Sequence, residues 1–108
     1  MIEARVHLDS RGGLARFDST GHSLFAPVGT DIVCAAFSVL ARSAFESLAA
    51  VPGVAVHESA AQPGEYSVVV DTVPPQMVER VAGIAGFLIV GLAGLQRDFP
   101  QSVRLTIE

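Results

Sequence analysis

The sequence predicts an α+β fold of two layers, in which two long helices cover one face of a mostly antiparallel five-stranded sheet. Five short segments alternate between apolar and polar residues, which is typical of strands with one buried face. Two longer segments carry apolar residues at helical spacing. The segments follow one another as ββαββαβ, and strands that each bury one face need a covering layer.

The first two strands are predicted from an alternating segment and a glycine turn. In residues 2–9, apolar side chains alternate strictly with polar or charged ones, so that one face is apolar. Residues 10–13 contain two consecutive glycines and are typical of a turn. A second strand is expected over residues 14–19, and the two strands should form a hairpin.

An irregular loop and the first helix are expected next. Two glycines and a proline interrupt residues 21–29, which have no regular period. From Thr30 onward, apolar residues recur at helical spacing, and no glycine or proline follows until Pro52. We place this helix at about residues 31–50 and expect Thr30 or Asp31 to cap its N-terminus.

The remaining elements follow the same two patterns. A third strand is expected over residues 54–57 and a fourth over 66–70, with a turn at 62–64 between them. Two prolines introduce a second helix over residues 75–98, since proline at a first helical position loses no intrahelical bond. Residues 103–107 alternate again and predict the last strand.

Composition favours one small globular domain over residues 1–108, in the cytoplasm. Half of the residues are hydrophobic and the net charge is −4, so we expect no direct binding of nucleic acid. A single cysteine excludes an intrachain disulfide and fits a reducing compartment. The start of the chain lacks the pattern of a signal peptide. The longest apolar run falls short of the roughly 20 residues that span a bilayer, so no membrane association is expected.

Cys34 and His22 are the residues that suit chemistry. Cys34 falls in the first turn of the predicted helix, where unpaired N–H groups and the helix dipole favour a thiolate. The same N–H groups are placed to stabilise an oxyanion. His22 follows a predicted strand and is available as a general base. These residue types suit a thiol nucleophile with its base.

Spacing alone leaves other interpretations open. A lone cysteine is often a small buried hydrophobe, and His22 fits an ordinary loop histidine. No metal or cofactor is expected, because one cysteine with His7, His22 and His57 shows none of the usual ligand spacings.

The residues around this pair form a specific motif. Its parts are Gly-His at 21–22, a short glycine-containing loop, Asp-Ile-Val-Cys-Ala at 31–35 and Ser-x-Leu at 38–40. This motif closely resembles the signature of the ribosomal-processing cysteine protease family (Prp), and the predicted element order and length are similar as well. The resemblance implies a cysteine peptidase with Cys34 and His22 as its catalytic pair. It also implies a homodimer and a substrate, the precursor of large-subunit ribosomal protein twenty-seven, from which the family removes a short N-terminal extension.

Four further motif residues are candidates for supporting or substrate-binding roles. Asp31 caps the helix or orients His22, and Ser38 lies one turn past Cys34 on the same helix face. The other two are Gly21 and Gly29.

The sequence departs from the family pattern in the loop. Ser23 stands where members commonly have alanine, and residues 24–28 are mostly apolar where the loop is often polar or acidic. An apolar loop suits a pocket for apolar side chains, a cover over the site, or packing on the second helix.

The second helix supports a dimer independently of the motif. It contains four glycines, and each costs a helix about 1 kcal/mol against alanine, which indicates close approach to another surface. That surface is the sheet or the same helix of a partner chain.

Two other function classes stay open. The acidic composition and the apolar loop also suit a non-enzymatic ribosome-assembly module that binds a basic ribosomal protein. A thiol-dependent hydrolase or transferase of small molecules ranks last, since no cofactor loop supports it.

Overall fold

A computed structural model describes residues 1–27 and 29–108. The elements are β1 (Ile2–Leu8), β2 (Leu14–Thr20), α1 (Ile32–Ala49), β3 (Ala55–Ser59), β4 (Glu65–Thr72), η1 (Pro75–Met77), α2 (Val78–Asp98) and β5 (Val103–Ile107). The predicted order ββαββαβ is confirmed.

The second helix begins later than predicted. Residues 75–77 form the short 3₁₀ turn η1, and α2 starts at Val78 instead of residue 75. The N–H of Met77 donates to the Pro74 carbonyl at 2.9 Å, which is the tighter bonding pattern of a 3₁₀ turn. The first turn of the apolar helix is therefore wound more tightly than its period predicts.

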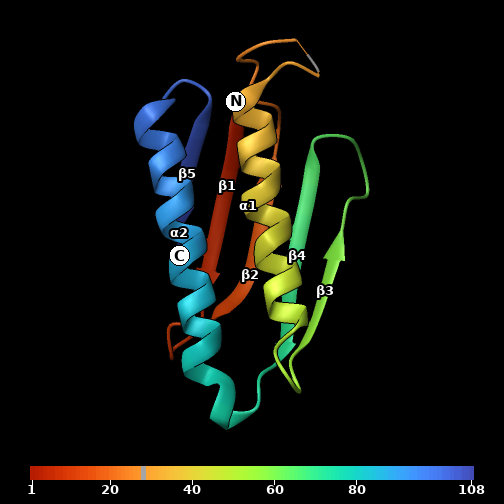
Figure 1. Cartoon of the computed structure of the whole chain (residues 1–108), viewed down its shortest axis with the longest axis vertical. Coiled ribbons are helices and arrows are strands. Elements are labelled where there is room, and N and C mark those ends of the chain that lie inside the picture. Colours follow the sequence, from red (N-terminus) through yellow and green to blue (C-terminus); the bar gives the residue numbers. More distant parts are fainter. Residues whose placement is uncertain (28) are drawn as a thin grey trace.

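The sheet is mixed and mostly antiparallel, with the order β3-β4-β2-β1-β5. Its β1–β2, β2–β4 and β3–β4 pairs are antiparallel, whereas β5 pairs with β1 in parallel. The chain reaches β5 through α2, which crosses over the sheet (Figure 1). The strand β2 therefore lies in the centre, and the loop that follows it leaves from the middle of the sheet.

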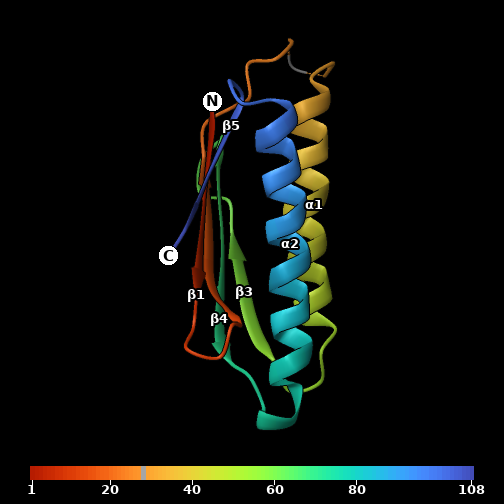
Figure 2. The same cartoon turned by 90° about the vertical axis from the view of Figure 1, so that its left-hand side faces the viewer.

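Both helices cover the same face of the sheet, as predicted (Figure 2). The core lies between the two layers, and the rings of Phe17 on β2 and Phe37 on α1 meet edge to face at 6.1 Å. The buried residues of α1 are Val33, Phe37, Ala41, Ala44 and Leu48. Five apolar residues at helical spacing predicted this helix. Four of them are buried and Leu40 is partly buried; the other four are Val33, Phe37, Ala44 and Leu48.

Of the four glycines in α2, Gly91 lies closest to another element. A Cβ at Gly91 would lie 2.7 Å from Cδ2 of Leu40, so the glycine lets α1 and α2 approach. A Cβ at Gly83 or Gly86 would meet no atom within 4 Å. The close approach that we expected is therefore found at one of the four glycines, but the surface that Gly91 meets is α1 of the same chain, which is neither the sheet nor a partner helix.

The outer face of the helix layer exposes large apolar side chains. Val39 on α1 is 66% exposed, and Phe87 and Val90 on α2 are 75% and 72% exposed. Phe87 lines one groove between the helices and Val39 lines a second. By length and composition alone both helices are apolar enough to cross a membrane, although each packs on the sheet along one side.

Candidate active site

Three segments meet at one end of the molecule and form the candidate site. They are the N-terminal turn of α1, the loop between β2 and α1, and the turn between β3 and β4 (Figure 1). The N–H of Gly21 donates to the carbonyl of Gly64 at 2.8 Å, which fastens the start of the loop to the β3–β4 turn.

Gly21 occupies a position that only glycine suits. Its φ is +91°, in the left-handed region that side chains disfavour. A Cβ there would also collide with the backbone carbonyl oxygen of Met1. Gly29 has the same φ of +91°, but a Cβ there would meet nothing within 4 Å. The two predicted glycines thus differ in how tightly they are packed.

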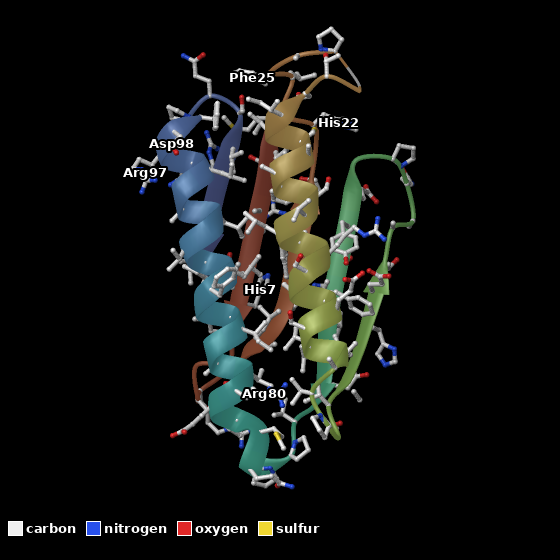
Figure 3. The ribbon with its side chains drawn as sticks, in the orientation of Figure 1. His7, His22, Phe25, Arg80, Arg97 and Asp98 are labelled. Atoms are coloured by element: carbon white, nitrogen blue, oxygen red, sulfur yellow. The ribbon has the colours of Figure 1, made fainter. Side chains whose placement is uncertain are left out.

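His22 is exposed and lies at the edge of the site (Figure 3). Its ring stands over Gly64, where a Cβ would lie only 2.8 Å from Nε2. Gly64 is therefore a site residue that the sequence analysis treated only as part of a turn. The turn glycine was the available signal, but sequence gives no sign that the imidazole lies above it.

Cys34 is the third residue of α1 and lies in its first turn, where we expected it. Its side chain is half-buried and packs against the core. One interpretation of the sequence was a small buried hydrophobe; Cys34 is instead half-buried and lines two hollows.

Two hollows meet at His22, Cys34 and Ser38. The first, a cleft of about 580 Å³, runs between α1 and the β3–β4 hairpin. The second, of about 460 Å³, lies under the loop and is lined by Leu24 and Ala26. His22, Cys34 and Ser38 line both hollows. A chain that passes from one hollow into the other would cross the thiol and the imidazole.

Asp31 caps the helix that carries Cys34. Its Oδ1 accepts hydrogen bonds from the N–H groups of Val33 and Cys34, both at 3.0 Å. The N–H of Ala35 donates to the Asp31 carbonyl at 3.1 Å. We expected unpaired N–H groups in this turn, where they would favour a thiolate or an oxyanion. The N–H groups of Val33 and Cys34 are instead paired with the capping carboxylate.

The second oxygen of the same carboxylate holds the loop. Oδ2 of Asp31 accepts from the Ser23 hydroxyl and from the N–H groups of Phe25 and Ala26, the latter two at 3.1 and 3.3 Å. Burial raises the pKa of the Asp31 carboxyl. Hydrogen bonds from the Ser23 hydroxyl and from three backbone N–H groups outweigh it and lower this pKa from 3.8 to about 2.

Asp31 does not bond to His22 directly. Within residues 1–27 and 29–108, the partners of its carboxylate are the Ser23 hydroxyl and four backbone N–H groups. The capping interpretation of Asp31 is therefore what the structure shows. A direct orienting contact with His22 is absent among these residues.

In the apolar loop, Phe25 packs against another part of the chain, whereas Leu24 is exposed to solvent. The ring of Phe25, which is labelled in Figure 3, meets that of Phe99, the residue that follows α2, edge to face at 5.3 Å. Leu24 has a φ of +55° and is 80% exposed beside the second hollow. Packing on the second helix and lining a pocket thus both occur, through different residues. Val28, the last residue of the predicted apolar stretch, lies outside the described residues.

The far end of the cleft is polar. The Tyr66 hydroxyl donates to Glu58 at 2.5 Å, and Arg42 and Glu65 line the same stretch. Burial, together with the hydrogen bond to Glu58, raises the pKa of Tyr66. In residues 1–27 and 29–108, no group of three or more His, Cys, Asp or Glu side chains is arranged to hold a metal ion.

Known proteins resemble this chain in sequence and in fold. The family described as cysteine protease Prp matches residues 1–104. The ribosomal processing cysteine protease Prp of Bacillus subtilis (strain 168) is 25% identical over an alignment that covers 98% of this chain and 96% of that protein.

Two solved structures have the same fold. The ribosomal processing protease Prp of S. aureus, in complex with a covalently linked product peptide, superposes with a TM-score of 0.86 at 16% identity and full coverage of both chains. SMU.848 from Streptococcus mutans superposes with a TM-score of 0.80 at 26% identity, over 99% of this chain and 93% of that one.

The two predicted glycines provide a matched pair of substitutions. Gly21→Ala should lower the free energy of unfolding by about 3 kcal/mol or more, because a strained φ and a backbone collision add. Gly29→Ala should cost about 1 kcal/mol, since only the φ is unfavourable. Urea unfolding of both variants measures the difference. Equal losses would contradict the collision with Met1.

The Asp31 carboxylate predicts a loss of stability in acid. Its pKa is lower in the folded chain than its ordinary 3.8, so the unfolded chain binds the proton first. The stabilisation is complete above pH 3.8 and is lost as the pH falls towards about 2. Asp31→Asn lacks this contribution. Thermal unfolding measured from pH 5 to pH 2 should show that the difference in melting temperature between wild type and variant becomes smaller. A constant difference would contradict the stabilising role of the ionised Asp31.

Proposed function

Because this chain belongs to the Prp family of cysteine proteases, we propose that it is the endopeptidase that removes the N-terminal extension of large-subunit ribosomal protein twenty-seven. Cys34 is the nucleophile of the proposed reaction and His22 is its general base. The observation that carries the proposal is that His22, Cys34 and Ser38 line two hollows, one on each side of the thiol. Such an arrangement accommodates a peptide on both sides of the bond to be cut.

The named relatives support the substrate class. The curated relative in Bacillus subtilis is a ribosomal processing protease, and the matching S. aureus protease was solved with a substrate peptide and with a covalently linked product peptide. A ribosomal protein precursor is rich in basic residues, and this chain carries a net charge of −4. The proposal places the enzyme in the cytoplasm, where its single cysteine stays reduced.

The proposed chemistry has two steps. His22 accepts the proton of the Cys34 thiol, and the sulfur attacks the carbonyl carbon of the scissile peptide bond. The tetrahedral intermediate collapses to a thioester when His22 returns the proton to the leaving amine. Water, deprotonated by the same imidazole, then attacks the thioester and releases the carboxylate and the thiol. No metal or cofactor takes part.

The oxyanion of this reaction needs donors other than the capped N–H groups of α1. The Asp31 carboxylate holds the N–H groups of Val33 and Cys34, so these become available only if it moves. Ser38 lines both hollows together with Cys34. We therefore assign Ser38 to substrate binding in this proposal.

Cleavage of a peptide that spans the junction of the N-terminal extension and the mature protein tests the assignment. Cys34→Ala should abolish cleavage, and His22→Ala should lower the rate by roughly 10²–10⁴-fold, the usual contribution of a general base. His57→Ala is the matched control, since that exposed histidine on β3 pairs with Asp71, and it should change the rate by no more than about twofold. Mass spectrometry of the products measures each rate.

The alternative, an assembly module that only binds, predicts a different result. Wild type would then bind the peptide without cleaving it, and Cys34→Ala would bind equally well. Cleavage that survives either Cys34→Ala or His22→Ala would show that the catalytic pair is wrong.

We also propose that the chain is a homodimer that pairs through the outer face of its helix layer. Val39 and Phe87 each line a groove on this face, and Val90 on α2 is also largely exposed. A second copy would bury the same residues by two-fold symmetry. Gly83 and Gly86 leave open space on the same helix, which suits the approach of a partner helix.

A charge on this face should separate the copies. Val90→Asp is expected to shift the chain from dimer to monomer in sedimentation experiments at micromolar concentration, because it would bury an unpaired carboxylate. Ile107→Asp, at a 49% exposed apolar residue on the edge strand β5, is the control and should remain dimeric. A monomeric wild type would contradict the proposed dimer.

A further inference from the structure

We infer that Ser23 is a positioning residue for His22, because its hydroxyl ties the loop beside the imidazole to the carboxylate that caps the Cys34 helix. The inference rests on the proposed roles of His22 and Cys34. The family pattern commonly has alanine at position 23, so the hydrogen bond from Ser23 to Asp31 is a property of this chain.

Ser23 directly follows His22 in the sequence, and its side chain is buried. Ser23 is 3% exposed, whereas His22 beside it is exposed. The Ser23 hydroxyl donates to Oδ2 of Asp31. Gly21, which precedes His22 in the sequence, donates its N–H to the carbonyl of Gly64 in the β3–β4 turn. The exposed His22 therefore stands between two fastened neighbours.

One carboxylate connects this tie to the nucleophile. Oδ2 of Asp31 accepts from Ser23, and Oδ1 accepts from the N–H groups of Val33 and Cys34. The two oxygens belong to one rigid planar group. The position of the loop next to His22 is thus set relative to the helix turn that bears the thiol.

Removing the Ser23 hydroxyl should affect the position of the base more than the fold. The loop stays attached after Ser23, since the N–H groups of Phe25 and Ala26 also donate to Oδ2. The cap on Val33 and Cys34 uses the other oxygen. The segment that gains freedom is the one that carries the imidazole. Misplacing a catalytic group by about 1 Å can cost roughly 100-fold in rate.

Alkylation of the thiol measures this effect without a peptide substrate. Cys34 is the single cysteine, so the rate of reaction with iodoacetamide reports on it alone. Ser23→Ala should slow the reaction at pH 7 by about tenfold, because His22 then removes the proton less effectively. The pH at which the rate is half-maximal should rise. In a His22→Ala background, Ser23→Ala should change neither quantity.

A control in the same loop tests whether any lost hydrogen bond has this effect. The Thr30 hydroxyl donates to the Pro27 carbonyl at 2.9 Å and is not among the donors to the Asp31 carboxylate. Thr30→Val should leave the alkylation rate within about twofold of wild type. Circular dichroism and urea unfolding verify that each variant is folded. Should Ser23→Ala not fold, Ser23→Gly provides the test, since it also removes the hydroxyl and leaves the Asp31 cap on Cys34 in place, and it should slow alkylation in the same His22-dependent way.

Two results would overturn the inference. The first is an unchanged alkylation rate in folded Ser23→Ala. The second is equal slowing with and without His22, which would show that the hydroxyl acts on the helix or on the fold. Failure of the proposed function appears separately: wild type would not cleave the peptide, while the His22-dependent effect of Ser23→Ala on alkylation would persist.

Discussion

The candidate site depends on the carboxylate of Asp31, which joins two segments that would otherwise be independent. One oxygen caps the N-terminus of the helix that carries Cys34, and the other accepts hydrogen bonds from the loop that follows His22. Five donors surround one buried anion, and the hydrogen bonds from the Ser23 hydroxyl and from the N–H groups of Ala26, Val33 and Cys34 outweigh the cost of burying it and lower the pKa of Asp31 to about 2. The carboxylate therefore remains charged at every pH at which an enzyme of this kind works.

This use of Asp31 changes what the start of α1 is available to do. A helix N-terminus is often an anion site because its first N–H groups are unpaired. Here a side chain of the protein occupies those of Val33 and Cys34. What remains for a substrate is the surface beyond the cap, where Ser38 and the two hollows flank the thiol. The helix start thus serves mainly to fix the loop and the nucleophile relative to each other.

Periodicity predicted most of the fold, because the buried faces of strands and helices repeat along the chain. The alternation in residues 2–8 and the stripe from Val33 to Leu48 are both found in the core. Periodicity did not predict that β5 pairs in parallel with β1, since pairing partners are chosen in space and not along the sequence. It also did not predict the tight turn at residues 75–77, whose bonding pattern is a local choice of the backbone.

The candidate pair and the cap were predictable because they are local. The motif indicated His22 and Cys34, and an aspartate just before a helix is a familiar cap. Gly64 was not recognised, because it meets the His22 ring across 42 positions of sequence (64 − 22). Ser23 was noted as a departure from the family pattern. Its role depends on a contact with Asp31 that becomes visible only when the loop folds back on the helix.

Amide hydrogen exchange of Asp31→Ala tests the joining role most directly. The account predicts that the N–H groups of Val33 and Cys34 and those of Phe25 and Ala26 exchange faster together, because one carboxylate protects both pairs. Asp9→Ala, which removes a carboxylate that caps a distant turn, should leave all four unchanged. Faster exchange at the helix pair alone, with the loop pair still protected, would contradict the account.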